Sequence, residues 1–385
     1  MLLLTLRSLT RRRLACLLLL LFLISGTAAL QLLGVLLCAQ EAALERVYDD
    51  FEIRCTVSNA SGTRTDGLNI FSYYLGLLQS CEQHDFAAQI KDLRLKISLP
   101  LDDMNGTQWK LRGITRLDAD YALLPENGAT VRFYDGYDES LLQTDRKLCL
   151  VPLSLAAELK LGADGARYAV LFVNGAQERF LVIGEYFSGA QNIVYCPFDY
   201  MYSRFSEQGE LLGAESASFN VRDNRELDAF RKNAYTYFLE PDPNATTPPG
   251  VFLGLLIQDA QFTATIQKID DNIHMLRLLI PTLCTVSVGI SFLASYLFMR
   301  GRARECAVMR TLGVHRGRVI LLLLCEQALL CALGGGSALL IWRLFELGKE
   351  PVLGALFAPC YLLGSLGSSL QSANPNVMML LRTED

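Results

Sequence analysis

The feature that most constrains this chain is a run of 25 residues without a charge, Leu14–Cys38, close to the N-terminus. A helix of about 20 apolar residues is long enough to cross about 30 Å of hydrocarbon. Three further runs have this character: 278–299, 319–342, which is broken only by Glu326 and Gln327, and the more polar 352–370. The sequence therefore predicts an α-helical membrane protein with four transmembrane helices.

The first run has two other interpretations. A basic start followed by small residues resembles a cleaved signal peptide, but the apolar part of a signal peptide is about 7–15 residues long and this run continues to Leu37. A lipoprotein signal ending at Cys38 would require a small residue at position 37, which is leucine. We therefore expect a retained span.

The arginines predict the orientation of the spans, because short cytosolic loops are rich in Lys and Arg. Four arginines precede the first run, and six lie in the loop 300–318. We therefore expect the chain to lie in the plasma membrane, with both termini and this loop in the cytosol. The predicted segments are a cytosolic N-terminus 1–13, spans 14–38, 278–299, 319–342 and 352–370, an extracytoplasmic region 39–276, a cytosolic loop 300–318, an external loop 343–351 and a cytosolic C-terminus 371–385.

Charge is distributed in the same pattern. Residues 39–276 contain 34 acidic and 21 basic residues, a net charge of −13, and the rest contain 6 and 14, a net charge of +8, which together give the −5 of the whole chain. Only 19% of the residues are charged, against about a quarter in a soluble domain. The acidic region lacks the basic face that a nucleic-acid binder needs, so nucleic acid is not an expected partner.

The pattern of region 39–276 is that of a mixed α/β domain. Residues 167–173 and 176–187 flank Asn174-Gly175, which is typical of a two-residue β-hairpin turn. Residues 129–136 and 191–198 are further strand candidates, and 153–161 is predicted to form a short helix. The breaker-rich segment 241–250 predicts a loop.

Four cysteines lie within this domain: Cys55, Cys81, Cys149 and Cys196. In an oxidising compartment they would be able to form two disulfides, with three connectivities that the sequence does not separate. The three histidines are far apart and no Cys/His cluster occurs, so a metal site is not expected.

Two helical segments, 39–54 and 259–276, are predicted to form a stalk. The second carries apolar residues at alternating steps of four and three, the spacing of a coiled-coil seam. The seam residues are Phe262, Ile266, Ile269, Ile273, Leu276 and Ile280. Leu44, Val47 and Phe51 continue the first span in the same way, and Pro281 is a candidate kink. The alternative is that each segment packs only on the domain's own core.

Catalytic motifs are not found. The sequence contains no GxSxG, HExxH or GxxxxGK[ST] pattern, so we expect neither an enzyme nor a chain that cradles ATP phosphates itself.

The arginine-rich loop carries the strongest functional signal. Cys306, Val308, Met309 and Leu312 are predicted to form an apolar stripe on a short helix, and Gly313 stands where that helix would end. Such a helix either lies on anionic lipid or docks into a groove on a partner, and the arginines alone do not separate the two.

The residues around this loop resemble permeases of the MacB/FtsX type, the transmembrane subunits of a class of ABC systems. The resemblance lies in Arg304-Glu305-x-x-Val308-Met309-Arg310-x-Leu312-Gly313-Val314, followed by a span with an early Glu326 and a glycine-rich middle. Residues 111–131 and 148–165, the hairpin, 192–201 and the C-terminal 374–385 resemble further parts of the same family. Together these motifs cover most of the chain.

The resemblance implies a non-catalytic subunit that works by mechanotransmission. A separate ABC ATP-binding subunit would bind ATP and Mg²⁺ and contact a coupling helix, to which the resemblance assigns Glu305, Met309, Arg310, Leu312 and Gly313. The chain carries neither a fused ATPase nor a second permease repeat, so a second permease copy or a paralogue is also expected. Substrates would be hydrophobic or peptide-like and would be exported, extracted or sensed.

Glu326 is the one acid deep within a predicted span, where a charge costs about 2.5–3.5 kcal/mol. One interpretation is that Glu326 is a conformational latch, which pairs with an arginine such as Arg316 or Arg318. The other is that it forms a purely structural ion pair near the membrane–water interface. Two other functions remain open. The first is a signalling permease that activates an extracytoplasmic cell-wall hydrolase, and the second is a membrane receptor with an extracytoplasmic ligand-binding domain.

Overall fold

The structure, a computed structural model, describes residues 13–80, 85–101, 108–162, 165–173, 176–189, 192–206, 213–243, 252–300, 303–344 and 352–372. The chain divides into two compact units. A helical unit contains Met1–Val47 and Ala264–Asp385, and a sheet domain contains Tyr48–Thr263. Each unit is described below by itself.

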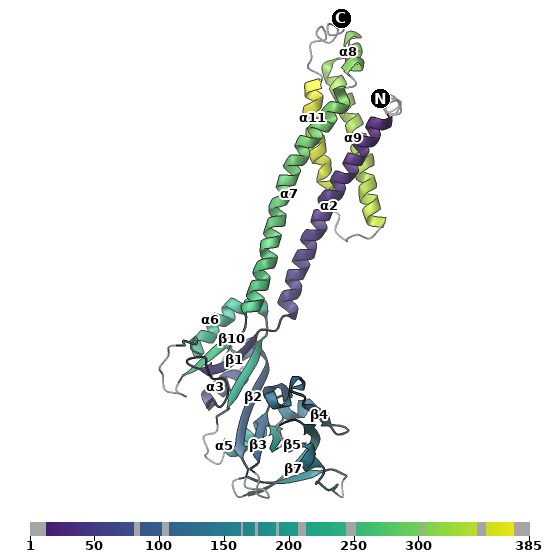
Figure 1. The fold of residues 1–385 in the computed structure, drawn as a ribbon. Coiled ribbons are helices and arrows are strands. Elements are labelled where there is room, and N and C mark those ends of the chain that lie inside the picture. The colour runs from purple at the N-terminus through teal and green to yellow at the C-terminus, as the bar shows by residue number, and fades with distance from the viewer. Residues whose placement is uncertain are drawn as a thin grey trace. The chain divides into compact units, whose positions relative to one another are not determined.

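The described residues of the sheet domain form ten strands and several short helices (Figure 1). The strands are β1 Arg54–Asn59, β2 Ile90–Pro100, β3 Lys110–Ile114, β4 Thr130–Phe133, β5 Leu148–Pro152, β6 Tyr168–Val173, β7 Ala176–Phe187, β8 Ile193–Pro197, β9 Ser216–Val221 and β10 Leu253–Ile257. The α-helices are α3 Ser72–Gln79, α4 Leu153–Ala156, α5 Phe198–Ser206 and α6 Leu227–Tyr237, and short 3-10 turns lie between these elements.

The strands form one mixed sheet in the order β10-β1-β9-β2-β3-β8-β5-β7-β4, with β6 paired to β7 off this path. The pairs β3–β8 and β5–β7 are parallel, and the other pairs are antiparallel. Within the domain, β1, β10, α3 and α6 lie at one end and β4, β5 and β7 at the other (Figure 1).

Two apolar cores hold this domain together. At one end, Phe86 stacks on Phe230 of α6 with ring centroids 5.6 Å apart and meets Phe219 of β9 edge-on. At the other end, buried aliphatic residues of β3, β5 and β7 pack around Tyr186 and Tyr195, whose rings are 5.1 Å apart. Ring pairs of this geometry add about 0.5–1.5 kcal/mol each to the burial of their area.

The helical unit is built on long apolar helices. The helices are α2 Arg13–Asp50, α7 Ala260–Arg300, α8 Ala303–Thr311, α9 Arg316–Leu344, α10 Val352–Ala355 and α11 Phe357–Ser372. The last residues of α2, from Tyr48, and the first residues of α7, to Thr263, belong to the sheet domain. Among the residues that the structure describes, four helical segments are long and apolar enough to cross a membrane: Cys16–Asp50, Ala260–Arg300, Arg316–Leu344 and Leu353–Gln371. The prediction of four long apolar helices and a mixed α/β domain is confirmed.

Small residues allow these helices to approach closely. A Cβ atom on Gly364 of α11 would lie 2.6 Å from the backbone oxygen of Val288 and 2.7 Å from the backbone nitrogen of Phe292, both on α7. A Cβ atom on Gly334 of α9 would lie 2.7 Å from Leu23 of α2. Helices that pack in lipid use small residues in this way.

Several boundaries differ from the predictions. The stalk segment 39–54 is helical only to Asp50, because Arg54 already begins β1. The helix expected over 153–161 is only the four residues of α4, since Leu161 pairs with Arg167 beside the sheet. The fourth apolar run is interrupted at Leu356. Pro359, in the first turn of α11, has no N–H group and would clash with the carbonyl of Ala355 in a continuous helix.

Other expectations are met. The hairpin is confirmed, because β6 and β7 are antiparallel with Val173 opposite Ala176, although its turn residues 174 and 175 lie outside the described residues. The strands expected in 129–136 and 191–198 are β4 and β8. The candidate kink does not interrupt α7, which is assigned as one helix through Pro281.

Candidate functional site

The helix α8 is held between two longer helices by specific end structures. At its C-terminal end the backbone N–H of Gly313 donates to the carbonyl of Arg310, and that of Val314 donates to the carbonyl of Met309, both at 3.1 Å. This pair of bonds is a Schellman motif, and it requires the left-handed backbone that Gly313 adopts with φ 83°. His315 then caps α9 by accepting the N–H of Gly317 on Nδ1 at 3.1 Å. The turn between α8 and α9 is therefore well defined.

One face of α8 packs inward. Cys306 is buried in a cluster with Met299 of α7 and Val319 and Leu323 of α9, and Met309 is half-buried against the same cluster. This packing holds α8 at the end of the apolar helices.

The opposite face of α8 is apolar but exposed. The side chain of Val308 is 57% exposed and that of Leu312 is 79% exposed. The prediction of one stripe over Cys306, Val308, Met309 and Leu312 is therefore wrong. At about 100° per residue, positions 306 and 308 are about 200° apart, so the four residues divide between two faces. The exposed pair forms what we call the α8 outer face, Val308 and Leu312.

Charged residues predicted here lie on α8 itself and at the start of α9. Glu305 is exposed and Arg310 is half-buried, and both interact with other residues of the protein. Arg316 and Arg318, at the start of α9, are exposed. The surface around the α8 outer face is thus apolar at its centre and carries basic residues along the chain that follows, a composition that suits a partner with an apolar groove and an acidic rim.

The predicted intramembrane acid lies inside the helical unit. Glu326 of α9 is only 1% exposed and interacts with other residues, while the side chains of Arg316 and Arg318 are exposed. The latch remains a prediction. Burial of an ionised carboxylate is costly unless polar groups compensate it, so the location itself marks Glu326 for a test.

A polar chain that the sequence analysis did not identify lies beside it. The hydroxyl of Tyr361 on α11 donates to Oε1 of Gln327 on α9, and Ser295 of α7 lies 3.5 Å from the same hydroxyl. Gln31 of α2 accepts the backbone N–H of Gly354 at 3.0 Å. The signal was present in the sequence as glutamines within apolar runs, because an uncharged amide in such a run needs a partner when it is buried.

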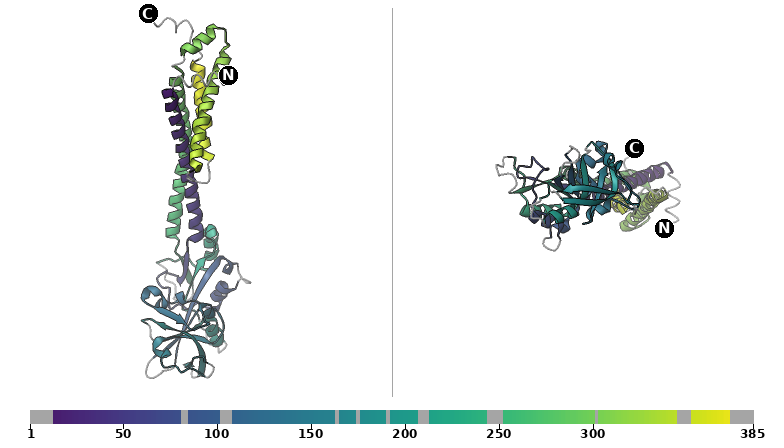
Figure 2. Two further views of the ribbon diagram at one scale, coloured as in Figure 1. Left: turned by 90° about the vertical axis from the view of Figure 1, so that its right-hand side faces the viewer. Right: turned by 90° about the horizontal axis from the view of Figure 1, so that it is seen from below.

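The residues of the predicted stalk seam are less exposed than their neighbours on α7. Phe262 and Ile273 are buried, Ile266, Ile269, Leu276 and Ile280 are half-buried, and every other residue from 261 to 280 is exposed. In the helical unit α2 and α7 lie side by side in both views, and Arg277 pairs with Glu41 at 2.8 Å (Figures 1 and 2). In the sheet domain the ring of Phe262 contacts those of Phe51 and Tyr48.

The cysteines of the sheet domain are free thiols where they are described. Cys55, Cys149 and Cys196 are buried and unbridged, and Cys81 lies outside the described residues. The two predicted disulfides are therefore not formed among these three residues. Burial raises the pKa of the Cys55 thiol to about 12, and Asp259 adds to the effect. A thiol that is buried and protonated behaves as a small apolar residue.

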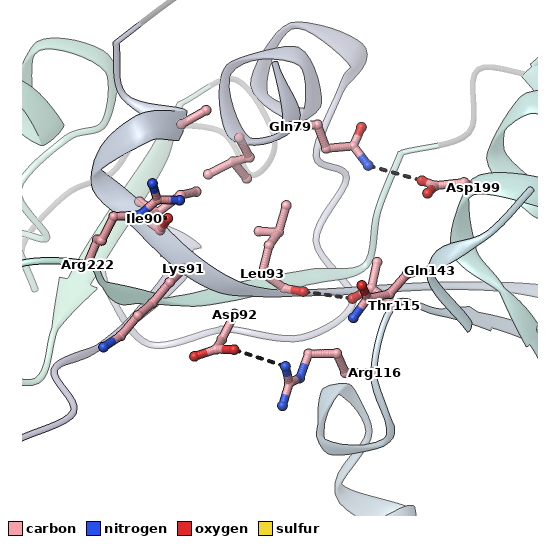
Figure 3. A pocket seen from close by; sticks show the side chains of 12 residues that line it. Gln79, Ile90, Lys91, Asp92, Leu93, Thr115, Arg116, Gln143, Asp199 and Arg222 are labelled. Atoms are coloured by element: carbon pink, nitrogen blue, oxygen red, sulfur yellow. Dashed lines mark hydrogen bonds and ion pairs between the residues drawn. The ribbon is translucent and has the colours of Figure 1, made fainter. Parts of the chain in front are cut away.

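A cavity of about 740 Å³ opens on the sheet domain (Figure 3). Leu78, Ala87, Ile90 and Leu93 provide apolar lining, and the charged lining residues are Lys91, Asp92, Arg116, Asp199 and Arg222. Asp92 has φ 53°, unusual for a non-glycine residue, and it lies where the register of β2 against β9 shifts.

Two contacts shape the charged rim of this cavity. Arg116 donates to the carboxylate of Asp92 at 2.9 Å, and Gln79 donates to that of Asp199 at 3.2 Å (Figure 3). Burial raises the pKa of Asp199 above its ordinary value; the hydrogen bond from Gln79 lowers it and the charge of Asp145 raises it further. The sequence did not single out this cavity, because its lining comes from segments far apart in the chain.

Comparisons with protein-family models and with curated proteins find no match for this sequence. In the described part of the chain no group of three or more His, Cys, Asp or Glu residues is arranged to hold a metal ion. The functional assignment therefore depends on the geometry given above and on the resemblance in sequence motifs.

Proposed function

We propose that this chain is the transmembrane permease subunit of an ABC transporter of the MacB/FtsX type, which couples ATP binding and hydrolysis on a separate subunit to movement of its sheet domain. The observation that carries the proposal is the α8 outer face. Two apolar side chains, Val308 and Leu312, stand exposed on a short helix whose other face and C-terminal end are held by packing and by a Schellman motif.

The exposure of this face supports a protein partner. Each apolar side chain left in water forgoes about 1.5–3 kcal/mol of burial free energy, so a helix that keeps its turn well defined yet exposes Leu312 is suited to insertion into a groove. The groove is assigned to an ABC ATP-binding subunit, which carries the ATP and Mg²⁺.

The long helices support the transmission of movement. α7 begins at Ala260 beside the strand β10 and continues to Arg300, three residues before α8, and α2 pairs with it along the seam. Coupling between distant sites requires an element with discrete arrangements that both sites bias. In this proposal the α2–α7 stalk is that element, and a second permease copy or paralogue completes the transporter.

The surface of the helical unit supports placement in a lipid bilayer. Large apolar side chains such as Leu17, Leu293 and Leu333 are exposed on α2, α7 and α9, where water would disfavour them. With the arginines on the cytosolic side, both termini and α8 are cytosolic and the sheet domain is extracytoplasmic, in the plasma membrane.

The test is co-purification of an ATP-binding subunit with the full chain and with variants of the α8 outer face. Leu312→Asp and Val308→Asp place a charge at exposed positions, so we expect both proteins to fold and both to lose the ATPase subunit. Leu161→Asp is a matched control, because Leu161 is 65% exposed in the sheet domain.

Retention of the ATPase subunit by both outer-face variants would remove α8 from the interface. Met309→Asp is a less specific variant than these two, since Met309 also packs against the inner cluster and a charge there disturbs the fold as well.

A signalling permease that activates an extracytoplasmic hydrolase is the second candidate, and one observation favours it. Val170 and Phe172 of β6 are exposed on the β6–β7 hairpin, an apolar surface that suits a protein rather than a small solute. Loss of hydrolase activation in Phe172→Asp, with the ATPase activity of the complex unchanged, would select this candidate over export.

A further inference from the structure

The cavity of the sheet domain contains charged groups that the proposed function does not use. Its volume of about 740 Å³ is in the range of sites that hold small molecules, about 300–1,000 Å³. Apolar side chains such as Leu93 form part of its wall. Three cations and two carboxylates also line it, a net charge of +1, whereas region 39–276 has a net charge of −13. A ligand with an apolar part and an anionic group therefore suits this cavity.

Two cations of the lining are available to an anion. Among the described residues, no carboxylate pairs with Lys91 or Arg222, and the one hydrogen bond of the Arg222 guanidinium runs from Nε to a backbone carbonyl of β2 at 3.2 Å. The third cation, Arg116, is already paired with Asp92. Lys91 and Arg222 lie on the same side of Leu93 (Figure 3). This side of the cavity suits a carboxylate, because charge-assisted hydrogen bonds are stronger than neutral ones.

The other side of the cavity provides hydrogen-bond acceptors. Asp199 and Gln143 lie across Leu93 from the two cations (Figure 3). Gln79 donates to Oδ1 of Asp199 at 3.2 Å, and Oδ2 has no partner among the described residues. Asp199 is half-buried, and no described basic residue pairs with it. A ligand ammonium group would provide the missing opposite charge.

The order of these groups favours a peptide over other amphiphilic ligands. Leu93 lies between the cationic side and the acidic side of the cavity (Figure 3). A zwitterionic phospholipid carries its two charges next to each other, and a fatty acid has no cation for Asp199. A short peptide carries its ammonium and its carboxylate at opposite ends, with its side chains between them.

We propose that this cavity binds short apolar peptides with free termini. The peptide carboxylate lies against Lys91 and Arg222, the ammonium lies against Asp199, and an apolar side chain packs on Leu93. The binding itself does not depend on the proposed function, whereas any effect of the peptide on an ATPase rests on that function.

One wall of the cavity continues to the end of a stalk helix. Arg222 directly follows β9, and two residues later the side-chain amide of Asn224 donates to the carbonyls of Tyr48 and Phe51 at 2.9 and 2.6 Å. These carbonyls lie where α2 ends. A peptide that fixes Arg222 would therefore act on the segment that holds the end of α2. In the proposed transporter, this contact gives the bound peptide a route to the stalk.

The experiment is calorimetric titration of the detergent-solubilised full chain with trileucine. We expect trileucine to bind at one site. Peptides blocked by N-acetylation or by C-amidation should bind about tenfold more weakly, because each loses one charge-assisted contact.

Variants assign the two ends of the peptide. Arg222→Gln should weaken the binding of trileucine about tenfold but should not weaken the C-amidated peptide further, because that peptide has no carboxylate. Asp199→Asn should behave in the same way toward the N-acetylated peptide. Lys232→Gln and Asp228→Asn are the matched controls, since both residues are exposed on α6 and neither lines the cavity. The controls should bind trileucine as the wild type does.

Three results would overturn the peptide site. They are no binding of trileucine, equal binding of free and blocked peptides, and binding of decanoate as tight as that of trileucine. The last result would identify the cavity as a site for an anionic lipid chain.

The route to the stalk is tested with the co-purified ATP-binding subunit. Trileucine should raise the ATPase rate of the wild-type complex but not that of Asn224→Ala, which should bind the peptide with unchanged affinity. An equal rise in both complexes, or no rise in either, would reject this route. The calorimetry needs no ATPase, so a failure of the proposed function is recognised separately from a failure of the peptide site.

Discussion

The helical unit and the sheet domain place polar and apolar residues in opposite ways. In the sheet domain rings such as Phe86 and Phe219 are buried, and most charges lie toward the surface. In the helical unit leucines are exposed, while Gln31, Ser291 and Glu326 are buried. The two units therefore differ in the kind of residue that they bury, and the proposed placement of the helical unit in a bilayer would account for the difference.

This difference has a physical cause. Water drives apolar side chains inward, whereas lipid provides no such force and leaves close packing and hydrogen bonds between helices to hold a bundle together. In the helical unit, glycines such as Gly364 let helices approach closely, and hydrogen bonds such as that from Tyr361 to Gln327 join one helix to another. Buried charges of the sheet domain such as Arg112 and Asp120 are paired, although the buried Oδ1 of Asn224 has no hydrogen-bond partner.

The largest effect should follow from breaking such a pair in the sheet domain. Arg112 and Asp120 form an ion pair with 14% and 5% of their side chains exposed, and Tyr195 donates to the same carboxylate at 2.8 Å. Burial lowers the pKa of Arg112, but Asp120, together with Tyr195 and Glu215, raises it by more in total. Asp120→Ala leaves a buried cation and a buried hydroxyl unpaired, which should cost about 3–5 kcal/mol. Urea unfolding of the full chain measures this loss.

An exposed ion pair gives the matched control. Arg231 pairs with Asp228, whose side chain is 96% exposed, and Asp228→Ala should cost about 0–1 kcal/mol. The double variant Arg112→Met/Asp120→Leu should recover most of the loss, since it removes both charges. If Asp120→Ala and Asp228→Ala lowered the free energy of unfolding by the same amount, burial of the ion pair would not determine how much its loss destabilises the protein.

The helical unit should respond most to an added methyl group. Gly364→Ala places a Cβ atom against the backbone of α7, and overpacking of this kind costs about 1–3 kcal/mol. We expect a lower thermal midpoint for the detergent-solubilised chain.

Gly336→Ala adds the same group where nothing lies within 4 Å, and alanine has the higher helix propensity, so its midpoint should stay the same or rise. The comparison between the two units would break down if both glycine variants behaved alike.

The smallest effect should be a pH-dependent one at the cavity. Burial raises the pKa of Asp199 above its unfolded value, so the folded state favours the protonated acid. The free energy of unfolding of the wild-type chain should fall as pH rises from the pKa of Asp199 in the unfolded state to its higher pKa in the folded state. Above the folded-state pKa the loss of stability is complete.

Asp199→Asn cannot ionise and keeps an oxygen for Gln79. Its urea midpoint should match that of the wild type at about pH 3 and exceed it at about pH 7. Asp228→Asn is the surface control, with no such pH-dependent gain. A gain of the same size at both pH values would argue against ionisation of Asp199 as the cause.

The sequence by itself determined the elements whose signal is local. Long uncharged runs predict long apolar helices, alternating steps of four and three predict the seam from Phe262 to Ile280, and Gly313 predicts the end of α8. Each of these patterns depends on residues within one or two turns of each other, so no knowledge of distant packing is needed.

Tertiary structure alone decided how these elements are used. It placed Cys306 and Met309 inward with Val308 and Leu312 outward, and it left the three described cysteines of the sheet domain unbridged. The physical reason is that contacts between residues far apart in the chain depend on how whole helices and strands pack. Periodicity gives an element its faces, but its neighbours decide which face is covered.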